Sequence, residues 1–365
     1  MHVVTLLLLI RVSRSMLPLL RGDMRGILLL EMPLSTCTVS ARACTMHMVF
    51  FAGCKSTMWC HGMIIDGGYE GLTMVGNALI TMYGQCRALQ DAKSVFGRTC
   101  HRDVISWNSM IAACTWNGRG KEALDYFDEM QRYDVKPNEI TFVCALDACA
   151  NLAILDMGQE IHAAIVDRGF EGQIIVGTAL LNMYGKCGSL ENATKVFGQL
   201  PKRDIVCWNA MIATYAQNGH DKEALDVFQR MLSNGIKPNG ATFVGVLTAC
   251  SHAGRVDDGR QFFLSMSQEH DIRYTVEHYK CLLDILGRAA GHLDEAEDLI
   301  KTMPFQSEAS VWLCLLAACR VHGDVERGVR AVGHIFKLDP GKAAPYILLS
   351  NVHAATGRND NAEKL

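Results

Sequence analysis

The chain has 365 residues, with 35 lysines and arginines against 38 aspartates and glutamates, and a formal net charge of −3. This balance excludes a protein that holds nucleic acid through bulk positive charge alone, because such proteins are basic. It leaves room for a surface that reads bases with few phosphate contacts. Hydrophobic residues make up 49% of the chain and prolines number only 8, so we expect ample apolar core and no long disordered linkers.

The N-terminal segment, residues 1–37, is rich in arginine, leucine and serine, and the first lysine of the chain is Lys55. This composition predicts an organelle transit peptide, with the mitochondrion favoured over the chloroplast. A secretory signal is the alternative, because Val3 to Ile10 is apolar, but no positive region precedes that run. Arginines interrupt every apolar run well short of about 18 residues, so no membrane-spanning helix is expected.

From residue 73 the chain repeats itself. VGNALITMYGQCRALQDAKSVF begins at Val75, and VGTALLNMYGKCGSLENATKVF begins 101 residues later at Val176. The repeat divides into units of 31, 35 and 35 residues, and a degenerate unit at 38–72 precedes them. The predicted units are 73–103, 104–138, 139–173, 174–204, 205–239, 240–275 (one residue longer) and 276–308 (one extra residue near Ala290).

Each unit is expected to fold as two helices. In the unit 104–138, apolar residues recur at three- and four-residue spacing on two faces, separated by a break at Asn117-Gly118 and ended by Pro137. These faces comprise Trp107, Met110, Ile111 and Cys114, then Ala123, Phe127 and Met130. One hairpin cannot bury its own apolar face, so the units are predicted to stack as an all-α solenoid.

Two further segments, 309–342 and 343–365, continue the helical pattern without the same repeat signature. The chain stops at Leu365, inside what should be a helix, and a solenoid needs a polar terminal cap. We therefore expect the sequence to be a truncated gene product or a fragment whose native chain continues.

The motifs of these units resemble those of pentatricopeptide repeats. Units of about 35 residues carry [IV]-x-WN-[SA]-MI, an EAL segment and a KPN ending, while MYGKCGSLENATKVF resembles the short repeats of the plant P-L-S subclass. The segment 309–342, with VWLCLLAACRVHGDVERG, resembles the E1 extension, and 343–365 resembles the start of E2. The resemblance implies a right-handed superhelix of helix-turn-helix repeats that binds single-stranded RNA.

In that family, the fifth and last residues of each unit select one base, with the N-terminal unit toward the RNA 5′ side. The chemistry is consistent with this role. Uracil and guanine present a ring N–H donor, which suits the acceptor-only carboxylate of Asp, whereas cytosine and adenine present a ring nitrogen acceptor, which suits the NH2 of Asn. At the fifth position, Asn goes with pyrimidines and Thr with purines.

The resemblance carries over to four pairs of residues. Asn77 with Asp103 implies U, Asn108 with Asn138 implies C with U tolerated, Thr178 with Asp204 implies G, and Asn209 with Asn239 implies C or U. The apolar second residues are expected to wedge between neighbouring bases; they are Met74, Ile105, Ile175 and Val206. The alternative role for any single Asn is a helix N-cap, but agreement at four equivalent positions favours readout.

Three other pairs receive no base assignment. They are Val143 with Gln173, Val244 with Thr275, and Lys280 with Glu308. The predicted footprint is therefore U-Y-N-G-Y-N-N, where Y is a pyrimidine and N any base.

Tetratricopeptide repeats, which bind peptides, are the structural alternative. Their first helix carries Trp-x2-Leu-Gly-x2-Tyr, whereas in this chain Trp107 is followed by Asn108, Met110 and Ile111. For 309–365 a protein-binding role stays open, because no base-reading pair is evident there.

An editing enzyme would need the H-x-E and C-x-x-C motifs of a zinc deaminase. None of the 13 histidines is followed two residues later by Glu, and no C-x-x-C occurs among the 15 cysteines, which we interpret as small helix-lining thiols. The sequence thus predicts no enzyme, cofactor or metal site. It predicts an RNA-binding adaptor for organellar C-to-U editing, with a deaminase supplied in trans through 309–365. Transcript stabilisation, splicing, a protein-interaction scaffold and a degenerate gene are the alternatives.

Overall fold

The computed structural model describes residues 72–289, 292–304, 308–339 and 347. The predicted transit peptide at 1–37, the degenerate unit at 38–72 apart from Leu72, and the segment 343–365 apart from residue 347 lie outside these residues. The chain divides into two compact units, 1–148 and 149–365.

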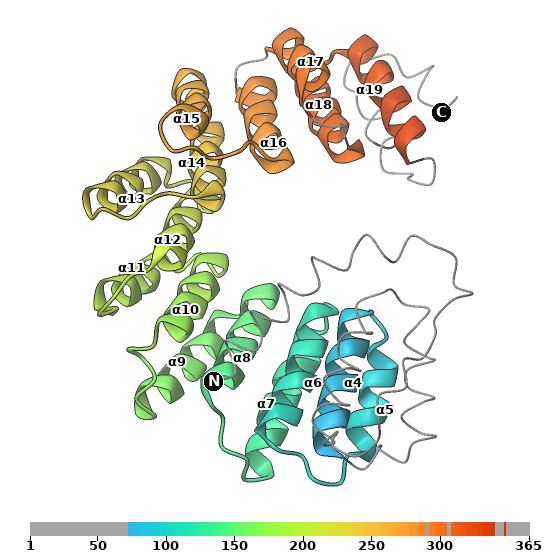
Figure 1. The fold of residues 1–365 in the computed structure, drawn as a ribbon, viewed down its shortest axis with the longest axis vertical. Helices are drawn as coiled ribbons and strands as arrows, with labels where there is room; N and C mark the ends of the chain where they lie inside the picture. Colours follow the sequence, from blue (N-terminus) through green and yellow to red (C-terminus); the bar gives the residue numbers. More distant parts are fainter. Residues whose placement is uncertain (1–71, 290–291, 305–307, 340–346, 348–365) are drawn as a thin grey trace, which may run out of the picture. The chain divides into compact units, whose positions relative to one another are not determined.

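The described residues form helices and turns without strands, arranged as successive hairpins (Figure 1). The first helix of each hairpin is named here the A helix and the second the B helix. The A helices are α4 (Thr73–Gln85), α6 (Val104–Trp116), α8 (Glu139–Leu152), α10 (Ile174–Lys186), α12 (Ile205–Gln217), α14 (Gly240–His252), α16 (Val276–Asp284) and α18 (Ala309–His322). The B helices are α5 (Leu89–Arg98), α7 (Gly120–Arg132), α9 (Leu155–Asp167), α11 (Leu190–Gln199), α13 (Asp221–Ser233), α15 (Val256–Gln268), α17 (Leu293–Thr302) and α19 (Val325–Leu338).

The hairpin turns follow from the residues that break each helix. Gly118, with a φ of 71°, lies in the turn between α6 and α7, where the sequence predicted a break. At the other end, α7 stops at Arg132, five residues before Pro137, and Asp134 takes a left-handed φ of 54°. The proline therefore does not end α7 directly; its ring is buried in the link to the next A helix.

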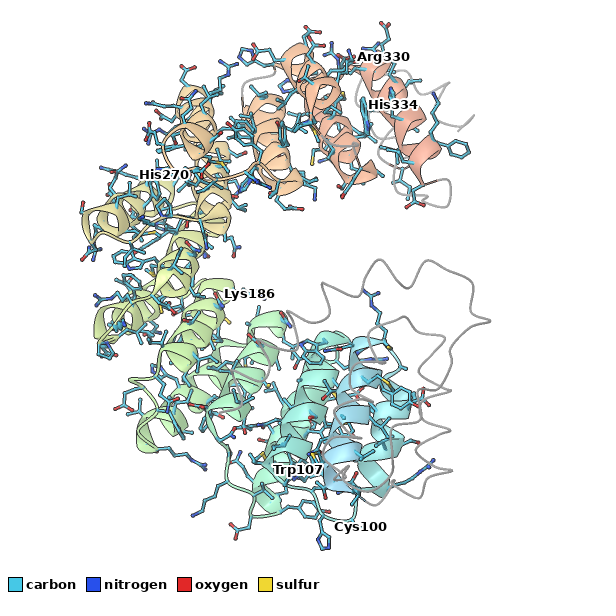
Figure 2. The ribbon with its side chains drawn as sticks, viewed as in Figure 1. Cys100, Trp107, Lys186, His270, Arg330 and His334 are labelled. Atoms are coloured by element: carbon cyan, nitrogen blue, oxygen red, sulfur yellow. The ribbon has the colours of Figure 1, made fainter. Side chains whose placement is uncertain are left out.

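Neighbouring A helices pack side by side, α4 against α6 in the first unit and α10, α12, α14, α16 and α18 in succession in the second. Every apolar residue predicted for the two faces of the unit 104–138 is buried. Trp107 is fully enclosed, with its ring centroid 5.0 Å from that of Phe96 on α5 (Figure 2). The prediction of an all-α stack of helical hairpins is confirmed.

The extra residue of the unit 276–308 coincides with a change of helix type. The A helix continues past Asp284 as a π-helix, Ile285–Ala289, directly before the position near Ala290 where the sequence is longer. A π-turn accommodates one more residue than an α-turn. None of the helices in the described part of the chain is long and apolar enough to cross a membrane.

Small residues set the distance between neighbouring A helices. Gly84 of α4 faces Ala113 of α6, and a Cβ added to Gly84 would lie 2.6 Å from the Cβ of Ala113 and 2.9 Å from its Cα. Neither neighbour is the flexible end of a side chain, so the backbones themselves would have to separate. The A-helix spacing in this hairpin pair therefore depends on glycine.

We predict that Gly84→Ala destabilises the protein by about 1–3 kcal/mol, the usual cost of overpacking. Gly97→Ala in α5 of the same repeat is the matched control, because its added Cβ would meet nothing within 4 Å. That change should raise stability by about 0.5–1 kcal/mol, since alanine favours the helix. Thermal unfolding of both variants measures the difference, and equal midpoints would contradict close packing at Gly84.

An ion-pair network joins the last two described hairpins. Glu297 of α17 accepts hydrogen bonds from Arg327 (2.8 Å) and Arg330 (3.1 Å) of α19, and from Lys301 (3.3 Å). Figure 2 labels Arg330 on α19. Burial alone would raise the pKa of Glu297, but the hydrogen bonds from Arg330, Arg327 and Lys301 outweigh it and lower the pKa to about 2.

A carboxyl whose pKa is lowered by folding stabilises the protein above its ordinary pKa, here 4.5, and loses that contribution as the pH falls toward 2. We therefore predict that Glu297→Gln lowers the melting temperature strongly at pH 7 and much less at pH 3. Glu326→Gln is the control, because this partner of Arg330 is 91% exposed and should matter little at either pH. A Glu297→Gln deficit that does not shrink at pH 3 would refute the role of its charge.

Candidate RNA interface

The predicted base-reading residues gather at the N-terminal ends of the A helices. The fifth residue of a unit lies one turn into its A helix, and the last residue caps the A helix of the next unit. Asn77 of α4 donates from Nδ2 to Oδ1 of Asp103 at 3.2 Å. The same Asp103 oxygen caps α6 by accepting the Ser106 backbone N–H at 2.8 Å.

The pair Asn108 and Asn138 is held in a closed ring with Thr141, the third residue of the following unit. Oδ1 of Asn138 accepts from the Thr141 backbone N–H at 3.0 Å and from Nδ2 of Asn108 at 3.1 Å. In return, the Thr141 hydroxyl accepts the Asn138 backbone N–H at 3.1 Å and donates to Oδ1 of Asn108 at 2.6 Å. A backbone N–H can only donate, so the ring fixes which end of each amide faces which partner.

The pair Asn209 and Asn239 repeats this ring with Thr242. The bond between the two asparagines is 3.1 Å, the Thr242 backbone N–H reaches Oδ1 of Asn239 at 3.1 Å, and the Thr242 hydroxyl donates to Oδ1 of Asn209 at 2.6 Å. N-capping is the alternative to base readout that the sequence leaves open for a single Asn. The structure shows that Asp103, Asn138, Asp204 and Asn239 each cap a helix with Oδ1.

Capping consumes only one of the two terminal atoms of each last residue. Within the described residues, Oδ2 of Asp103 and Nδ2 of Asn138 and Asn239 have no hydrogen-bond partner. Burial alone would raise the pKa of Asp103, but hydrogen bonds from the Ser106 backbone and hydroxyl and from Asn77 outweigh it and lower the pKa below 3.8. Asp103 therefore presents an acceptor at neutral pH, whereas Asn138 and Asn239 present donors.

The fourth pair has a different geometry. The Thr178 hydroxyl donates to the Ile174 carbonyl of its own helix at 2.9 Å and lies 3.2 Å from Sγ of Cys207. Asp204 accepts from the Val206 and Cys207 backbone N–H groups at 3.1 and 3.0 Å. The structure thus joins the members of the three Asn pairs but does not join Thr178 to Asp204.

The apolar second residues of these units are exposed to solvent, unlike the buried apolar residues of the core. The four predicted wedge residues are exposed by 59% (Met74), 57% (Ile105), 48% (Ile175) and 53% (Val206). Ile140 occupies the same place at the start of α8 and is 41% exposed, although the sequence-based prediction does not include it. Its signal is present in the sequence, because it is the apolar second residue of the unit 139–173.

The three units without a base assignment lack a pair of asparagine or aspartate side chains at their fifth and last positions. Val143 and Val244 have no polar side-chain atom, and the ammonium group of Lys280 pairs with Glu277 at 2.9 Å rather than with Glu308. The third position of the final repeat holds a buried His278, whose Nδ1 accepts the Thr275 backbone N–H at 3.1 Å. Its Nε2 then donates to the Gly240 carbonyl at 2.9 Å.

The cysteines belong to the packing. Burial raises the pKa of the thiols of Cys114, Cys149, Cys250 and Cys319, at one equivalent place in four A helices, to about 12. No group of three metal-binding side chains was found where side chains are described. These thiols therefore act as small apolar residues.

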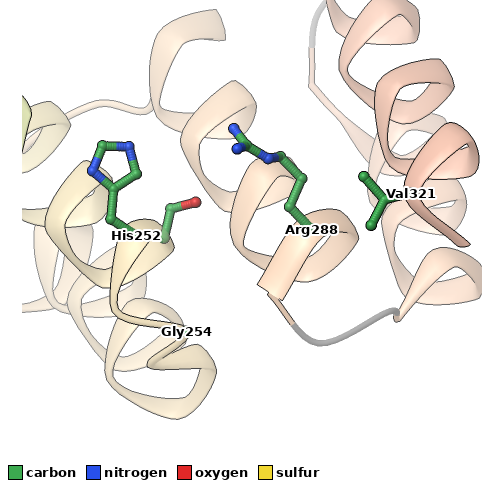
Figure 3. Close-up of a pocket in the computed structure, with 5 residues that line it drawn as sticks. His252, Gly254, Arg288 and Val321 are labelled. Carbon is green, nitrogen blue, oxygen red and sulfur yellow. The ribbon is translucent and has the colours of Figure 1, made fainter. Parts of the chain in front are cut away.

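A cleft of about 400 Å³ lies elsewhere, at the turn ends of the A helices in the C-terminal half (Figure 3). Ser251, His252, Gly254, Arg288 and Val321 line it. The Arg288 guanidinium lies 3.2 Å from the Asp284 carboxylate, which neutralises it. The cleft is thus no strong anion site.

Models of a known repeat family match part of the chain. A model of the PPR repeat family matches residues 102–151 and 203–252, and a PPR repeat model matches 178–205. The chain is 40% identical over 307 residues to the Arabidopsis thaliana pentatricopeptide repeat-containing protein CRR2, chloroplastic, covering 84% of this chain and 47% of that protein. It is 39% identical over 331 residues to the Arabidopsis thaliana protein At5g46460, mitochondrial, covering 90% of this chain and 46% of the relative.

Solved structures agree on the fold. PPR10 in complex with an 18-nt psaJ RNA element matches with a TM-score of 0.67 at 16% identity, over 88% of this chain and 49% of that one. PPR10 from maize matches with a TM-score of 0.59 at 17% identity, over 88% of this chain and 47% of that one. The chain spans about half the length of the curated relatives it matches.

The capping role of the last residue makes a prediction about stability. Asp103→Ala should cost about 1 kcal/mol, because the first turn of α6 loses its cap. Asp103→Asn should cost much less, since an amide Oδ1 can still accept from Ser106. Chemical denaturation of the two variants measures this, and an equal loss in both would show that the cap is not made by Oδ1.

Proposed function

Because this chain is built from pentatricopeptide repeats and is related to plant proteins named for them, we propose that it binds single-stranded RNA and reads one base per repeat. The proposal concerns a binding protein, not an enzyme. PPR10, whose fold is similar to that of this chain, has been solved in complex with an 18-nt RNA element.

One observation supports base readout above the others. The last residue of each assigned Asn pair keeps one terminal atom without a partner among the described residues, and the chemistry of that atom differs between units. Oδ2 of Asp103 can only accept, which matches the ring N–H of uracil. Nδ2 of Asn138 and Asn239 can only donate, which matches the ring nitrogen of cytosine.

The exposed apolar second residues support the same surface. They lie three residues before the fifth position, nearly one helical turn away and therefore on the same side of the A helix. An exposed aliphatic side chain beside a polar pair can pack between neighbouring bases. The edge of one of these bases then faces the polar pair. The proposed footprint, from 5′ to 3′, is U-Y-N-G-Y-N-N.

We further propose that the bound RNA is an organellar transcript and that the chain supplies the address for C-to-U editing. The matched relatives carry both chloroplastic and mitochondrial names; the arginine-rich N-terminal segment favours the mitochondrion. The hairpin α18–α19 extends the array without an Asn or Asp pair, so this end suits a protein partner such as a deaminase acting in trans.

Substitutions that exchange a donor for an acceptor at the unpaired terminal atom of the last residue test the proposal. Asp103→Asn should change the preferred first base from U to C, and Asn138→Asp should change the second from C to U. Each change should alter discrimination by roughly 1–3 kcal/mol, the scale of base-edge contacts. Binding titrations against RNAs that vary only at the base in question measure both preferences.

Asp125→Asn on α7 is the matched control for Asp103→Asn, because it removes the same charge from an exposed site on a B helix. It should strengthen binding slightly and equally for all RNAs. Wild-type preferences in both Asp103→Asn and Asn138→Asp, with wild-type affinity, would overturn base readout by the last residue.

A further inference from the structure

The ring of hydrogen bonds around two of the asparagine pairs contains a residue that belongs to the next repeat. Thr141 and Thr242, both fully buried, lie at the third position of their units. Each hydroxyl lies 2.6 Å from Oδ1 of the fifth-position Asn of the preceding unit, closer than its other acceptor, Oδ1 of Asn138 at 3.0 Å or of Asn239 at 3.2 Å. The conformation of the fifth-position Asn is therefore set from the neighbouring hairpin.

Other units hold different chemistry at this position. Ser106 donates its hydroxyl to Oδ1 of Asp103 at 2.9 Å, and no hydrogen bond joins it to the fifth-position residue Asn77 in the described structure. Oδ1 of Asn77 is buried and has no hydrogen-bond partner in the described structure. At the Thr178 pair the third position is Cys207, whose thiol is at most a weak donor.

The difference between threonine and serine has a physical cause. A hydroxyl has one hydrogen and can donate to one acceptor at a time. The β-branch of threonine restricts χ1, whereas serine can rotate toward whichever acceptor is nearer. A fixed donor keeps Oδ1 of Asn108 occupied and its Nδ2 directed at Oδ1 of Asn138, which leaves Nδ2 of Asn138 outside the ring of hydrogen bonds.

We propose that the third residue of a repeat that follows an Asn pair is a positioning residue for base selection by that pair. It does not contact RNA. A threonine there sharpens selection by locking the fifth-position Asn, and a serine leaves that Asn partly unsatisfied. This inference rests on the proposed RNA-reading function and adds a residue from the next hairpin to each reading pair.

The test compares variants by selectivity at single bases. Thr141→Val keeps the shape of the side chain but removes the hydroxyl, which leaves Oδ1 of Asn108 unpaired. Selectivity for the second base of U-Y-N-G-Y-N-N should fall by about fivefold or more, with selectivity at the other bases unchanged. Thr242→Val should do the same at the fifth base only.

Ser106→Thr is the gain-of-function arm. It should supply the missing donor to Asn77 and increase selectivity for U at the first base by a few-fold. Thr115→Val is the control in the same repeat as Asn108, because its buried hydroxyl bonds only within α6, to the Ile111 carbonyl at 3.0 Å. It should leave base selectivity unchanged.

The outcomes separate this inference from the function it rests on. If the wild type does not discriminate bases at these positions, the proposed function fails. If the wild type discriminates, and the folded Thr141→Val and Thr242→Val variants keep full selectivity, the positioning role is overturned. Should the valine variants fail to fold, an unchanged U preference in Ser106→Thr overturns it instead.

Discussion

Each A helix begins with backbone N–H groups that have no partner within the helix and must be capped from outside. In four of the hairpins the cap comes from the last residue of the preceding repeat, through one side-chain oxygen. That requirement fixes the side chain in one orientation and leaves its second terminal atom outside the cap. The proposed reading of bases would be a second use of the same side chain, which the packing of the hairpins holds in place.

Two different linkers bring the last residue to the same place. The short repeats end with an arginine before the Asp: Arg102 donates to the Phe96 and Gly97 carbonyls at 3.1 and 3.3 Å and folds the link back onto α5. The repeat 104–138 uses a left-handed residue, Asp134, and a buried proline, Pro137, instead. The repeat lengths of 31 and 35 residues differ mainly in the B helix, which has 10 residues in α5 and 13 in α7, whereas the A helices α4 and α6 both have 13.

Much of this could be predicted from sequence, because helical periodicity is a local property. The burial of Trp107, Met110 and Phe127 followed from spacing alone. Hydrogen bonds between repeats did not, because they depend on how neighbouring side chains turn in space. Periodicity and spacing do not indicate that Thr141 closes a ring, that Oδ1 of Asn77 is unpaired, or that Thr178 bonds to its own helix instead of Asp204.

The central claim is that the uncapped atom of the last residue contacts the ring nitrogen of the base. Replacing the cytosine at the second footprint position with 3-deazacytidine, which has a C–H in place of ring N3, tests this contact in the RNA without altering the protein. The account predicts that affinity falls by about tenfold, within the range of base-edge contacts, while the same replacement at an unassigned position has no effect. Equal affinity for cytidine and 3-deazacytidine at the second position would show that Nδ2 of Asn138 does not read that base.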